Sequence, residues 1–441
     1  MQKLSPKLID RLNYLGISAL NSMQEASMET MSKRNNVLLL SPTGTGKTLA
    51  FLLPLLDKIN TDSATNQAII IAPSRELAIQ INDVFKSLQT EIHSTLCYGG
   101  HSIEIETRNL SSSPQIIIGT TGRIVDHIKH DRISPQFVHT LILDEFDKSL
   151  EVGFEEEMRV VVEQCTKLEN RILCSATNTV RIPDFVGFDK YKELDFINQS
   201  QTNDKVVMKR VISPDKDKLE TLDHTLRNIG NKSTLVFCNH REALERVREY
   251  LDDQGFVAEI FHGKLEQNYR ESALIKFRNK SCNILIATDL AARGIDVDEL
   301  DYIIHYHIPK KLEEFTHRNG RTARMNASGT IILIQAAEER LPDYILEEIP
   351  EWKLDLSHEE IADPEWETLF IGAGKKEKVN KIDIVGFLTN QGKLDKADVG
   401  LITVKDHFSY VAVKREDIVH LIKKIRNEKI KKKKVKIEIA K

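Results

Sequence analysis

The stretch from Ser41 to Thr48, with the sequence Ser-Pro-Thr-Gly-Thr-Gly-Lys-Thr, constrains the fold of this chain more than any other. It follows the apolar run 37–40, which predicts a buried strand, and it precedes 49–59, which predicts a helix. A strand, a glycine-containing loop and a helix N-terminus form a phosphate cradle, because backbone N–H groups and the helix dipole favour negative charge. Lys47 can reach the outer phosphates of a nucleotide, and the Thr48 hydroxyl can hold Mg²⁺.

The alternative is an ordinary glycine-rich turn between a strand and a helix. The usual phosphate loop opens with glycine, and here that position is Ser41. The Gly-Lys-Thr ending and its place between a strand and a helix favour nucleotide binding.

The composition predicts a soluble globular protein of two or three domains. The chain has 441 residues, of which 29% are charged and 41% hydrophobic. No apolar run approaches the roughly 20 residues of a membrane span, and the N-terminus shows no signal-peptide core. The five cysteines are scattered without a close pair, which argues against a zinc site or a disulfide framework and predicts a cytoplasmic location.

The net charge of −4 hides an asymmetry between the two ends of the chain. Residues 372–441 carry 19 Lys and Arg against 9 Asp and Glu, whereas the preceding residues are acidic overall. A basic tail on an acidic body predicts that the tail binds a polyanion, although a merely solvated charged end is the alternative.

Residues 36–197 alternate apolar strands with helical patterns, after one or two helices within 1–35. The predicted strands are 37–40, 68–72, 116–119, 140–143 and 171–174. Alternation of this kind predicts a parallel sheet covered on both faces, with ligands at the carboxyl ends of the strands.

Polar motifs follow three of these strands. Asp144-Glu145-Phe146-Asp147 follows 140–143, and one carboxylate there can bind Mg²⁺ while its neighbour positions or deprotonates water. Ser175-Ala176-Thr177 supplies two hydroxyls that can sense a γ-phosphate, and Pro73 to Ala78 begins a helix that carries Arg75. Helix capping explains each motif singly, but not their coincidence beside a Gly-Lys-Thr loop.

A polar stretch without periodicity, 198–208, predicts a linker, and a second alternation without a phosphate loop follows it. Its predicted strands are 233–237, 257–261, 283–287, 302–305 and 330–334. The chain therefore reads as two α/β units in tandem.

Two motifs stand out in the second unit: 287–296 holds Arg293 among small residues, and 317–324 holds three arginines and a histidine. Arginines on a second lobe can complete a site whose phosphates and Mg²⁺ lie on the first, and such arginine fingers raise phosphoryl-transfer rates by several powers of ten in other systems. A surface basic helix with ordinary salt bridges is the alternative.

The acidic segment 346–374, which holds both tryptophans, predicts a connector that packs on the second unit. Beyond it the pattern predicts strands at 381–387, 408–413 and 435–439 and a helix at 418–425. Phe408 and Tyr410 lie on one face of a strand with basic neighbours. Exposed aromatic rings in that setting can stack RNA bases, whereas a core strand with its rings inside is the alternative.

With these motifs in view, residues 14–340 resemble the DEAD-box RNA helicases of superfamily 2. Gln24 matches the adenine-reading glutamine, 41–48 the phosphate loop, 73–78 the Pro-Thr-Arg-Glu-Leu-Ala element and 144–147 the element that names the family. The other matches, in order, are Gly99-Gly100, Thr120-Thr121-Gly122-Arg123, Ser175-Ala176-Thr177, 287–297 and 317–324. The tail resembles the RRM-like RNA-binding domain of DbpA-type bacterial helicases, which act on ribosomal RNA during large-subunit assembly.

The resemblance implies an α/β fold of two RecA-like lobes with a small α+β tail, and ATP and Mg²⁺ as cofactors. The domains would be 1–197, 198–208 (linker), 209–345, 346–374 (connector) and 375–441. The implied nucleotide contacts are Gln24, Thr43, Gly44, Thr45, Gly46, Lys47, Thr48 and Asp296, with Thr48 and Asp144 toward the metal. Lys47, Asp144, Glu145 as base, and the fingers Arg321 and Arg324 would be catalytic.

The remaining implied roles concern RNA and coupling between the lobes. The RNA-gripping residues would be Arg75, Gly100, Thr120, Arg123 and Arg293, with Phe408 and Tyr410 in the tail. Ser175, Thr177 and Asp147 would couple the lobes. The departures from the family pattern are Phe146 for Ala, Thr121 for Pro, Ala323 for Gly and the lack of an aromatic residue upstream of Gln24, for which Tyr14 is a possible substitute.

These features predict an ATP-dependent RNA helicase, acting as a monomer on structured RNA and not at a membrane. ATP and a single RNA strand would close the two lobes and bend the strand, which opens a short duplex. Two alternatives remain at this stage, a nucleotide-gated RNA clamp with little unwinding and a DNA translocase. Displacement of a short duplex would distinguish the first, and equal stimulation by DNA and RNA would favour the second.

Overall fold

The computed structural model describes most of the chain in two units. The described residues are 4–42, 44–149, 155–177, 182–197, 206–289, 300–322, 329–345, 348–357, 360–361, 363–431 and 433–440. Backbone contacts place 4–197 in the first unit and the residues from 206 onwards in the second. Four residues with a predicted role lie outside the described residues, namely Thr43, Arg293, Asp296 and Arg324.

The first unit is built on a parallel sheet that, within its described residues, has seven strands in the order β3-β4-β2-β5-β6-β1-β7. The strands are β1 (Asn36–Leu40), β2 (Ala68–Ile71), β3 (Ser94–Cys97), β4 (Ile116–Gly119), β5 (Thr140–Leu143), β6 (Asn170–Ser175) and β7 (Lys192–Asp195). All five predicted strands are confirmed. The sequence pattern missed β3 and β7, which lie at the two edges of the sheet, where a strand needs no continuous apolar run.

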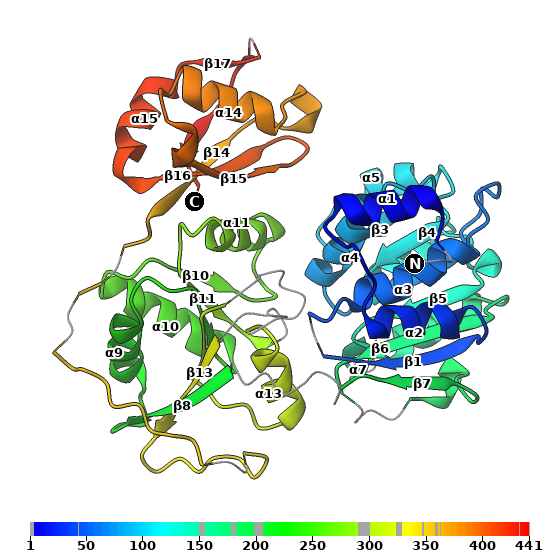
Figure 1. Cartoon of the computed structure of the whole chain (residues 1–441), viewed down its shortest axis with the longest axis horizontal. Helices are drawn as coiled ribbons and strands as arrows, with labels where there is room; N and C mark the ends of the chain where they lie inside the picture. Colours follow the sequence, from blue (N-terminus) through cyan, green and yellow to red (C-terminus); the bar gives the residue numbers. More distant parts are fainter. Residues whose placement is uncertain are drawn as a thin grey trace. The chain divides into compact units, whose positions relative to one another are not determined.

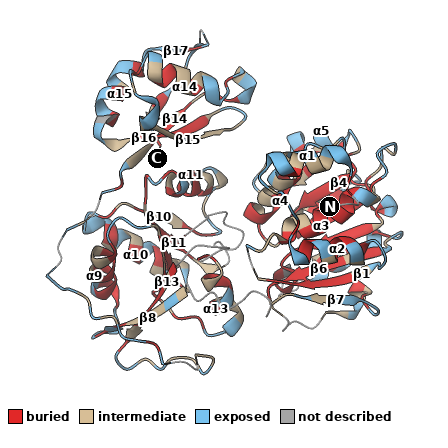
Figure 2. Ribbon diagram, viewed as in Figure 1, coloured by how far each residue is buried: buried red, intermediate tan, exposed pale blue. Residues whose placement is uncertain are grey.

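Helices cover this sheet (Figure 1). They are α1 (Pro6–Tyr14), α2 (Ser22–Met31), α3 (Lys47–Lys58), α4 (Arg75–Ser87), α5 (Ile103–Leu110), α6 (Thr121–Lys129), α7 (Phe146–Ser149) and α8 (Glu155–Gln164). Val37 and Leu39 of β1 belong to one hydrophobic cluster, and Leu38 and Leu40 belong to another. Both faces of the sheet are therefore buried at its central strands, which Figure 2 colours red, whereas the edge strand β7 is largely exposed.

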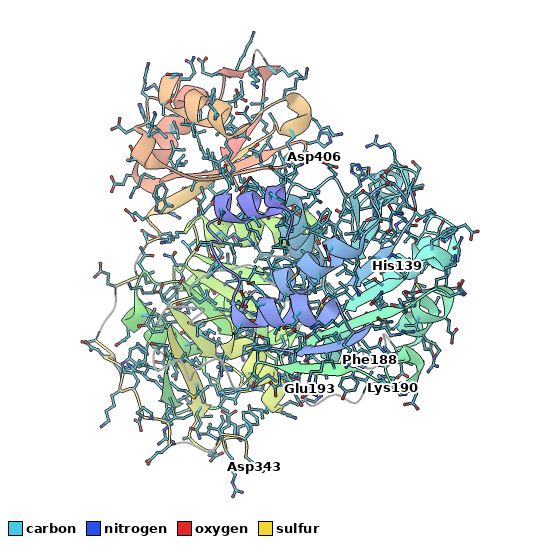
Figure 3. The ribbon with its side chains drawn as sticks, turned by 45° about the vertical axis from the view of Figure 1, so that its right-hand side comes forward. His139, Phe188, Lys190, Glu193, Asp343 and Asp406 are labelled. Atoms are coloured by element: carbon cyan, nitrogen blue, oxygen red, sulfur yellow. The ribbon has the colours of Figure 1, made fainter. Side chains whose placement is uncertain are left out.

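The parallel strands give the sheet two chemically different edges. His139, labelled in Figure 3, immediately precedes β5, whereas Asp144 immediately follows it. Every strand of the sheet runs in the same direction, so the residues that follow the strands gather at one side of the sheet, where the carboxyl ends of all the strands lie. This side is called the carboxyl edge, as distinct from the outer strands β3 and β7. That edge carries the predicted site.

The second unit repeats this architecture. Its described residues form a six-stranded parallel sheet in the order β10-β11-β9-β12-β13-β8. The strands are β8 (Val206–Ser213), β9 (Thr234–Phe237), β10 (Ala258–Phe261), β11 (Ile284–Ala287), β12 (Tyr302–His305) and β13 (Gly329–Ala336). The helices are α9 (Leu219–Ile229), α10 (Arg241–Asp253), α11 (Gln267–Arg278) and α13 (Leu312–Asn319). All five predicted strands are confirmed, but β8 begins at Val206, so the predicted linker 198–208 extends too far.

The tail is a small α+β fold. Its antiparallel sheet has the order β15-β16-β14-β19, with β14 (Trp366–Ile371), β15 (Val399–Val404), β16 (Ser409–Lys414) and β19 (Ile437–Ile439). The helices are α14 (Lys381–Asn390) and α15 (Ile418–Ile425), and β17 (Lys429–Ile430) pairs with β18 (Lys433–Lys434). Short 3₁₀ turns of the tail lie at Lys375–Glu377, Lys396–Asp398 and Arg415–Asp417, and two more lie in the first unit, at Pro135–Phe137 and Asp184–Val186.

Two predictions for the tail are wrong. Lys381–Phe387, expected as a strand, is helix α14, because Asn380 and Asp383 form a capping box and Ile384, Phe387 and Leu388 recur on one buried face. The sheet also begins at Trp366, before the predicted start at 375, since β14 pairs with both β16 and β19. By contrast, Trp352 packs on the core of the second lobe as expected, and its backbone N–H donates to the carbonyl oxygen of Arg210.

No helix among the described residues is long and apolar enough to cross a membrane.

Gly119 at the end of β4 provides a test of how tightly the first sheet is packed. A Cβ atom added there would lie 2.1 Å from the backbone carbonyl oxygen of Cys97 on β3, which cannot move without breaking the strand pairing. We expect Gly119→Ala to lower the free energy of unfolding of this unit by roughly 2 kcal/mol or more, as overpacking does. Denaturant unfolding followed by circular dichroism measures it.

The matched control is Gly122→Ala on α6. A Cβ atom there meets only the end of the Glu157 side chain, at 3.3 Å, and alanine favours the helix by up to about 1 kcal/mol. An equal effect of the two substitutions would contradict the close approach at Gly119.

Candidate nucleotide and RNA site

The loop between β1 and α3 has the backbone of a phosphate cradle. Gly44 and Gly46 have φ angles of 80° and 89°, in the left-handed region that glycine adopts without strain. Lys47 is the first residue of α3, and its Nζ donates to the carbonyl oxygen of Ser41 at 2.6 Å. The hydroxyl of Ser41, where the usual pattern has glycine, lies 2.7 Å from the Thr45 hydroxyl. The serine at this position therefore stabilises the loop by a hydrogen bond within it.

Helix α2 holds the same loop from outside. The Nε2 of Gln24 donates to the carbonyl oxygen of Gly46 at 3.3 Å, and the Nδ2 of Asn21 donates to that of Thr45 at 2.9 Å. The two side chains are themselves fixed by the capping box of α2. A Cβ atom at Gly46 would lie 2.6 Å from Gln24 Nε2, so a larger residue at position 46 would displace the end of the Gln24 side chain from its hydrogen bond.

Asp144 and Glu145 follow β5. In the sheet, β5 is the neighbour of β6, and β6 lies between β5 and β1. Asp144 is 3% exposed, and its Oδ1 accepts a hydrogen bond from the N–H of Glu145 at 3.0 Å. Burial raises the pKa of Asp144 to about 7, which the Lys47 ammonium opposes and the Glu145 and Asp147 carboxylates reinforce. A buried acid that is disfavoured as an anion by its own surroundings fits a residue whose partner is a bound cation.

Glu145 has a φ of 48°, an uncommon conformation for a residue with a side chain. Strain of this kind is found most often at functional sites. Asp147, on α7, is also buried. At the end of β6 the Ser175 hydroxyl donates to the carbonyl oxygen of Thr177 at 2.8 Å and accepts from its N–H at 3.0 Å. The ends of β1, β5 and β6 therefore gather the phosphate loop, both carboxylates and the Ser-Ala-Thr element.

The carboxyl ends of β2, β3 and β4, on the other half of the same edge, carry a second set of polar residues. Arg75 begins α4 after β2, and its guanidinium would lie 3.2 Å from a Cβ atom added at Gly99, which follows β3. Thr120 and Arg123 follow β4, where Arg123 donates to the carbonyl oxygens of Tyr98 and His101 at 3.3 and 3.1 Å. The glycine at 100, with a φ of 92°, shapes the turn between them.

In the second unit, Arg318 of α13 is the residue that the sequence analysis overlooked. Its guanidinium is fully buried and donates to both carboxylate oxygens of Asp289, at 2.5 and 2.6 Å, and to the carbonyl oxygen of His307. Such bidentate pairing fixes the helix against β11 and β12. Arg321, the predicted finger, follows α13 and is buried too.

Comparison with known proteins agrees with this arrangement. Family models match at 21–185 (DEAD/DEAH box helicase), 217–326 (helicase conserved C-terminal domain) and 368–439 (DbpA RNA binding domain). The ATP-dependent RNA helicases DbpA of Escherichia coli and Bacillus subtilis are 32% and 27% identical, each over 99% of this chain and 98% of the relative. The structure of Saccharomyces cerevisiae Dbp5 bound to RNA and ADP BeF3 is similar, with a TM-score of 0.69, 26% identity, and coverage of 79% of this chain and 94% of that one.

Two RecA-like lobes, the first with a phosphate loop and a buried Asp-Glu pair, define an ATP-dependent helicase. The chain belongs to the DbpA-type DEAD-box RNA helicases. The predicted fold, enzyme class and use of ATP are thereby confirmed, and RNA-stimulated ATP hydrolysis is its reaction.

The aromatic residues of the tail lie differently from the prediction. Tyr410 is 7% exposed, and its ring, with those of Phe408 and Phe370, packs near Ile275 of α11. Burial also raises the pKa of the Tyr410 hydroxyl. Tyr410 is therefore not exposed as expected, because α11 covers this part of the sheet face, whereas Phe408 is only half-buried. RNA binding by these two residues stays a prediction.

Polar contacts extend the same interface. The Thr368 hydroxyl lies 2.5 Å from that of Ser281 and accepts from the Nδ2 of Asn279 at 3.0 Å. Arg415 donates to the carbonyl oxygen of Ser281, and Lys405 pairs with Glu271 at 3.5 Å. No sequence signal distinguished this use of the rings from base stacking, since both need aromatic residues on one face of a strand.

Asp144 should make the stability of the ligand-free protein depend on pH. Its folded-state pKa of about 7 lies above its usual value of 3.8, so the folded state binds the extra proton and loses stability as pH rises from about 4 to 7. We expect Asp144→Asn to raise the melting temperature relative to the wild type by roughly 4 °C more at pH 8 than at pH 4.5. The control is Asp184→Asn, at an exposed aspartate. If Asp144→Asn changed the melting temperature by the same amount at both pH values, the raised pKa assigned to Asp144 would be contradicted.

A disulfide across the tail interface tests whether the covered sheet face must open for RNA. Two cysteines, introduced as Ser281→Cys and Thr368→Cys, would replace hydroxyls that touch. Because Tyr410 is already buried against α11 and Phe408 is half-buried, we expect the oxidised protein to keep its RNA affinity and RNA-stimulated ATPase activity within about twofold. The single variant Thr368→Cys controls for the neighbouring Cys282. A tenfold loss of RNA affinity that a reductant restores would show that the face binds RNA.

Proposed function

We propose that this helicase remodels structured ribosomal RNA during assembly of the large ribosomal subunit. The observation that carries the proposal is the tail, whose residues 368–439 match the DbpA RNA binding domain and are strongly basic. DEAD-box lobes grip phosphates and sugars, which are the same in every RNA, so a choice of RNA must come from the tail. We also propose that the protein acts as a monomer in the cytoplasm, in keeping with its five unpaired cysteines and with both lobes and the tail on one chain.

The proposed chemistry assigns a role to each part of the first edge. Bound Mg²⁺ would neutralise the phosphate charge that develops during ATP hydrolysis. The loop Gly44 to Gly46 and Lys47 would cradle the phosphates, Thr48 and Asp144 would face the metal, and Gln24 would read the adenine. Glu145 would accept a proton from the attacking water. Asp296 would contact the ribose, and Arg321 and Arg324 would serve as the arginine fingers.

The RNA strand would lie along the other half of the edge. Arg75, Gly100, Thr120 and Arg123 carry donors suited to phosphate oxygens, and Arg293 would add one from the second lobe. Ser175, Thr177 and Asp147 would link the nucleotide half to closure of the lobes. The support for this division is geometric, since β2, which leads to Arg75, is the sheet neighbour of β5, which leads to Asp144.

The proposal is tested with the full chain and a panel of ribosomal RNA fragments. We expect one structured fragment of large-subunit RNA to stimulate ATP hydrolysis at a concentration at least tenfold below that of unrelated RNA of equal length. Glu145→Gln should bind the same fragment but lose turnover by 10²-fold or more, which separates binding from hydrolysis. Equal stimulation by every RNA would refute the ribosomal assignment while leaving the helicase activity untouched.

A further inference from the structure

A buried carboxylate in the first unit joins the elements of the RNA half of the edge. Glu106 lies on α5 and is 0% exposed. Its Oε1 accepts from the N–H of Tyr98 at 3.1 Å and lies 3.1 Å from the Nδ1 of His101. Its Oε2 lies 2.7 Å from the Nε2 of His127 and 3.5 Å from the Nε of Arg123, both on α6.

These partners surround the turn that holds Gly99 and Gly100. Tyr98 and His101 are the residues on either side of that turn, and their rings stack at 5.2 Å. Arg123 binds the turn a second time, through the carbonyl oxygens of Tyr98 and His101. One carboxylate therefore connects α5, α6 and the turn through three hydrogen bonds and one ion pair.

The charge of Glu106 is stable in this setting. Burial alone would raise its pKa, but the hydrogen bonds from His101, His127 and the Tyr98 N–H, together with the Arg123 charge, lower the pKa to about 2. Removing the carboxylate would leave its buried partners without an acceptor, which is costly.

The network does not suit a metal ion, although Cys97, Glu106 and His127 bring their ligand atoms within 4.8 Å of one another. Burial raises the pKa of the Cys97 thiol, so it does not supply a thiolate. The carboxylate oxygens already take part in three hydrogen bonds, and the Arg123 guanidinium, which pairs with Oε2, would repel a cation.

We propose that Glu106 is a positioning residue for RNA binding, which holds Arg123 and the Gly99-Gly100 turn in the geometry that grips the phosphate backbone. The inference rests on the proposed RNA contacts of Arg123 and Gly100. Glu106 touches no RNA itself, because it is fully buried. No feature of the sequence distinguishes it from its exposed helix neighbour Glu104.

The test compares Glu106→Gln with the matched control Glu104→Gln. Glutamine keeps the shape of the side chain but removes the charge that pairs with Arg123 and places an amide donor among groups that need an acceptor, so the turn is no longer held. We expect the RNA concentration for half-maximal ATPase activity to rise at least tenfold, with ATP affinity in the absence of RNA unchanged within twofold. Glu104→Gln, exposed on the same helix, should match the wild type in both measurements.

Two further variants keep the inference open to refutation. His127→Leu replaces a fully buried imidazole ring and removes its contact with Glu106. We expect the RNA concentration for half-maximal ATPase activity to rise several-fold, and His127→Gln should bring it most of the way back to the wild-type value. An equal loss of RNA and ATP binding in these variants, with a lowered melting temperature, would overturn the inference in favour of general destabilisation.

Arg123→Gln separates this inference from the proposed function. If it weakens RNA binding while the Glu106 and His127 variants do not, the positioning role fails and the RNA contacts stand. If Arg123→Gln itself leaves RNA binding unchanged, the proposed contact fails, and the inference built on it fails as well.

Discussion

The parallel pairing of buried strands in the first unit is the constraint on which its chemistry depends. Leu40 of β1 pairs with Ser175 of β6, and Leu143 of β5 pairs with Leu173, so the three strands end at one edge of the sheet. Strand pairing, and not sequence proximity, therefore brings the phosphate loop, the Asp-Glu pair and the Ser-Ala-Thr element together. The neighbouring strands β2, β4 and β3 continue the edge and carry the second polar group.

Two buried carboxylates of this unit show how similar burial produces opposite charge behaviour. Asp144 and Glu106 are both almost inaccessible to water. Glu106 receives hydrogen bonds from two histidines and a backbone N–H beside an arginine, and its pKa falls to about 2. Asp144 has two carboxylates and one ammonium as neighbours, and its pKa rises to about 7. The first carboxylate is satisfied within the fold, whereas the second has the character of a ligand that awaits a cation.

Much of the fold could be predicted from the sequence because both sheets are buried on two faces. Such strands read as continuous apolar runs, and all ten predicted strands of the two lobes are present. The strands that were missed, β3, β7 and β8, lie at sheet edges. The tail was less predictable, because β14 and β15 are only partly buried and the apolar residues of α14 resemble a strand over a few positions.

The sequence by itself determined the order of the motifs, the phosphate loop, the Asp-Glu pair and the basic tail, since each depends on residue types at short spacing. Only the tertiary structure decided which side chains serve the fold and which remain available. Glu106, Arg318 and Tyr410 look like ordinary surface residues or candidate ligand contacts in the sequence, yet each is buried against partners on other elements of the fold. The physical reason is that burial and hydrogen-bond satisfaction arise from long-range packing, which local patterns do not encode.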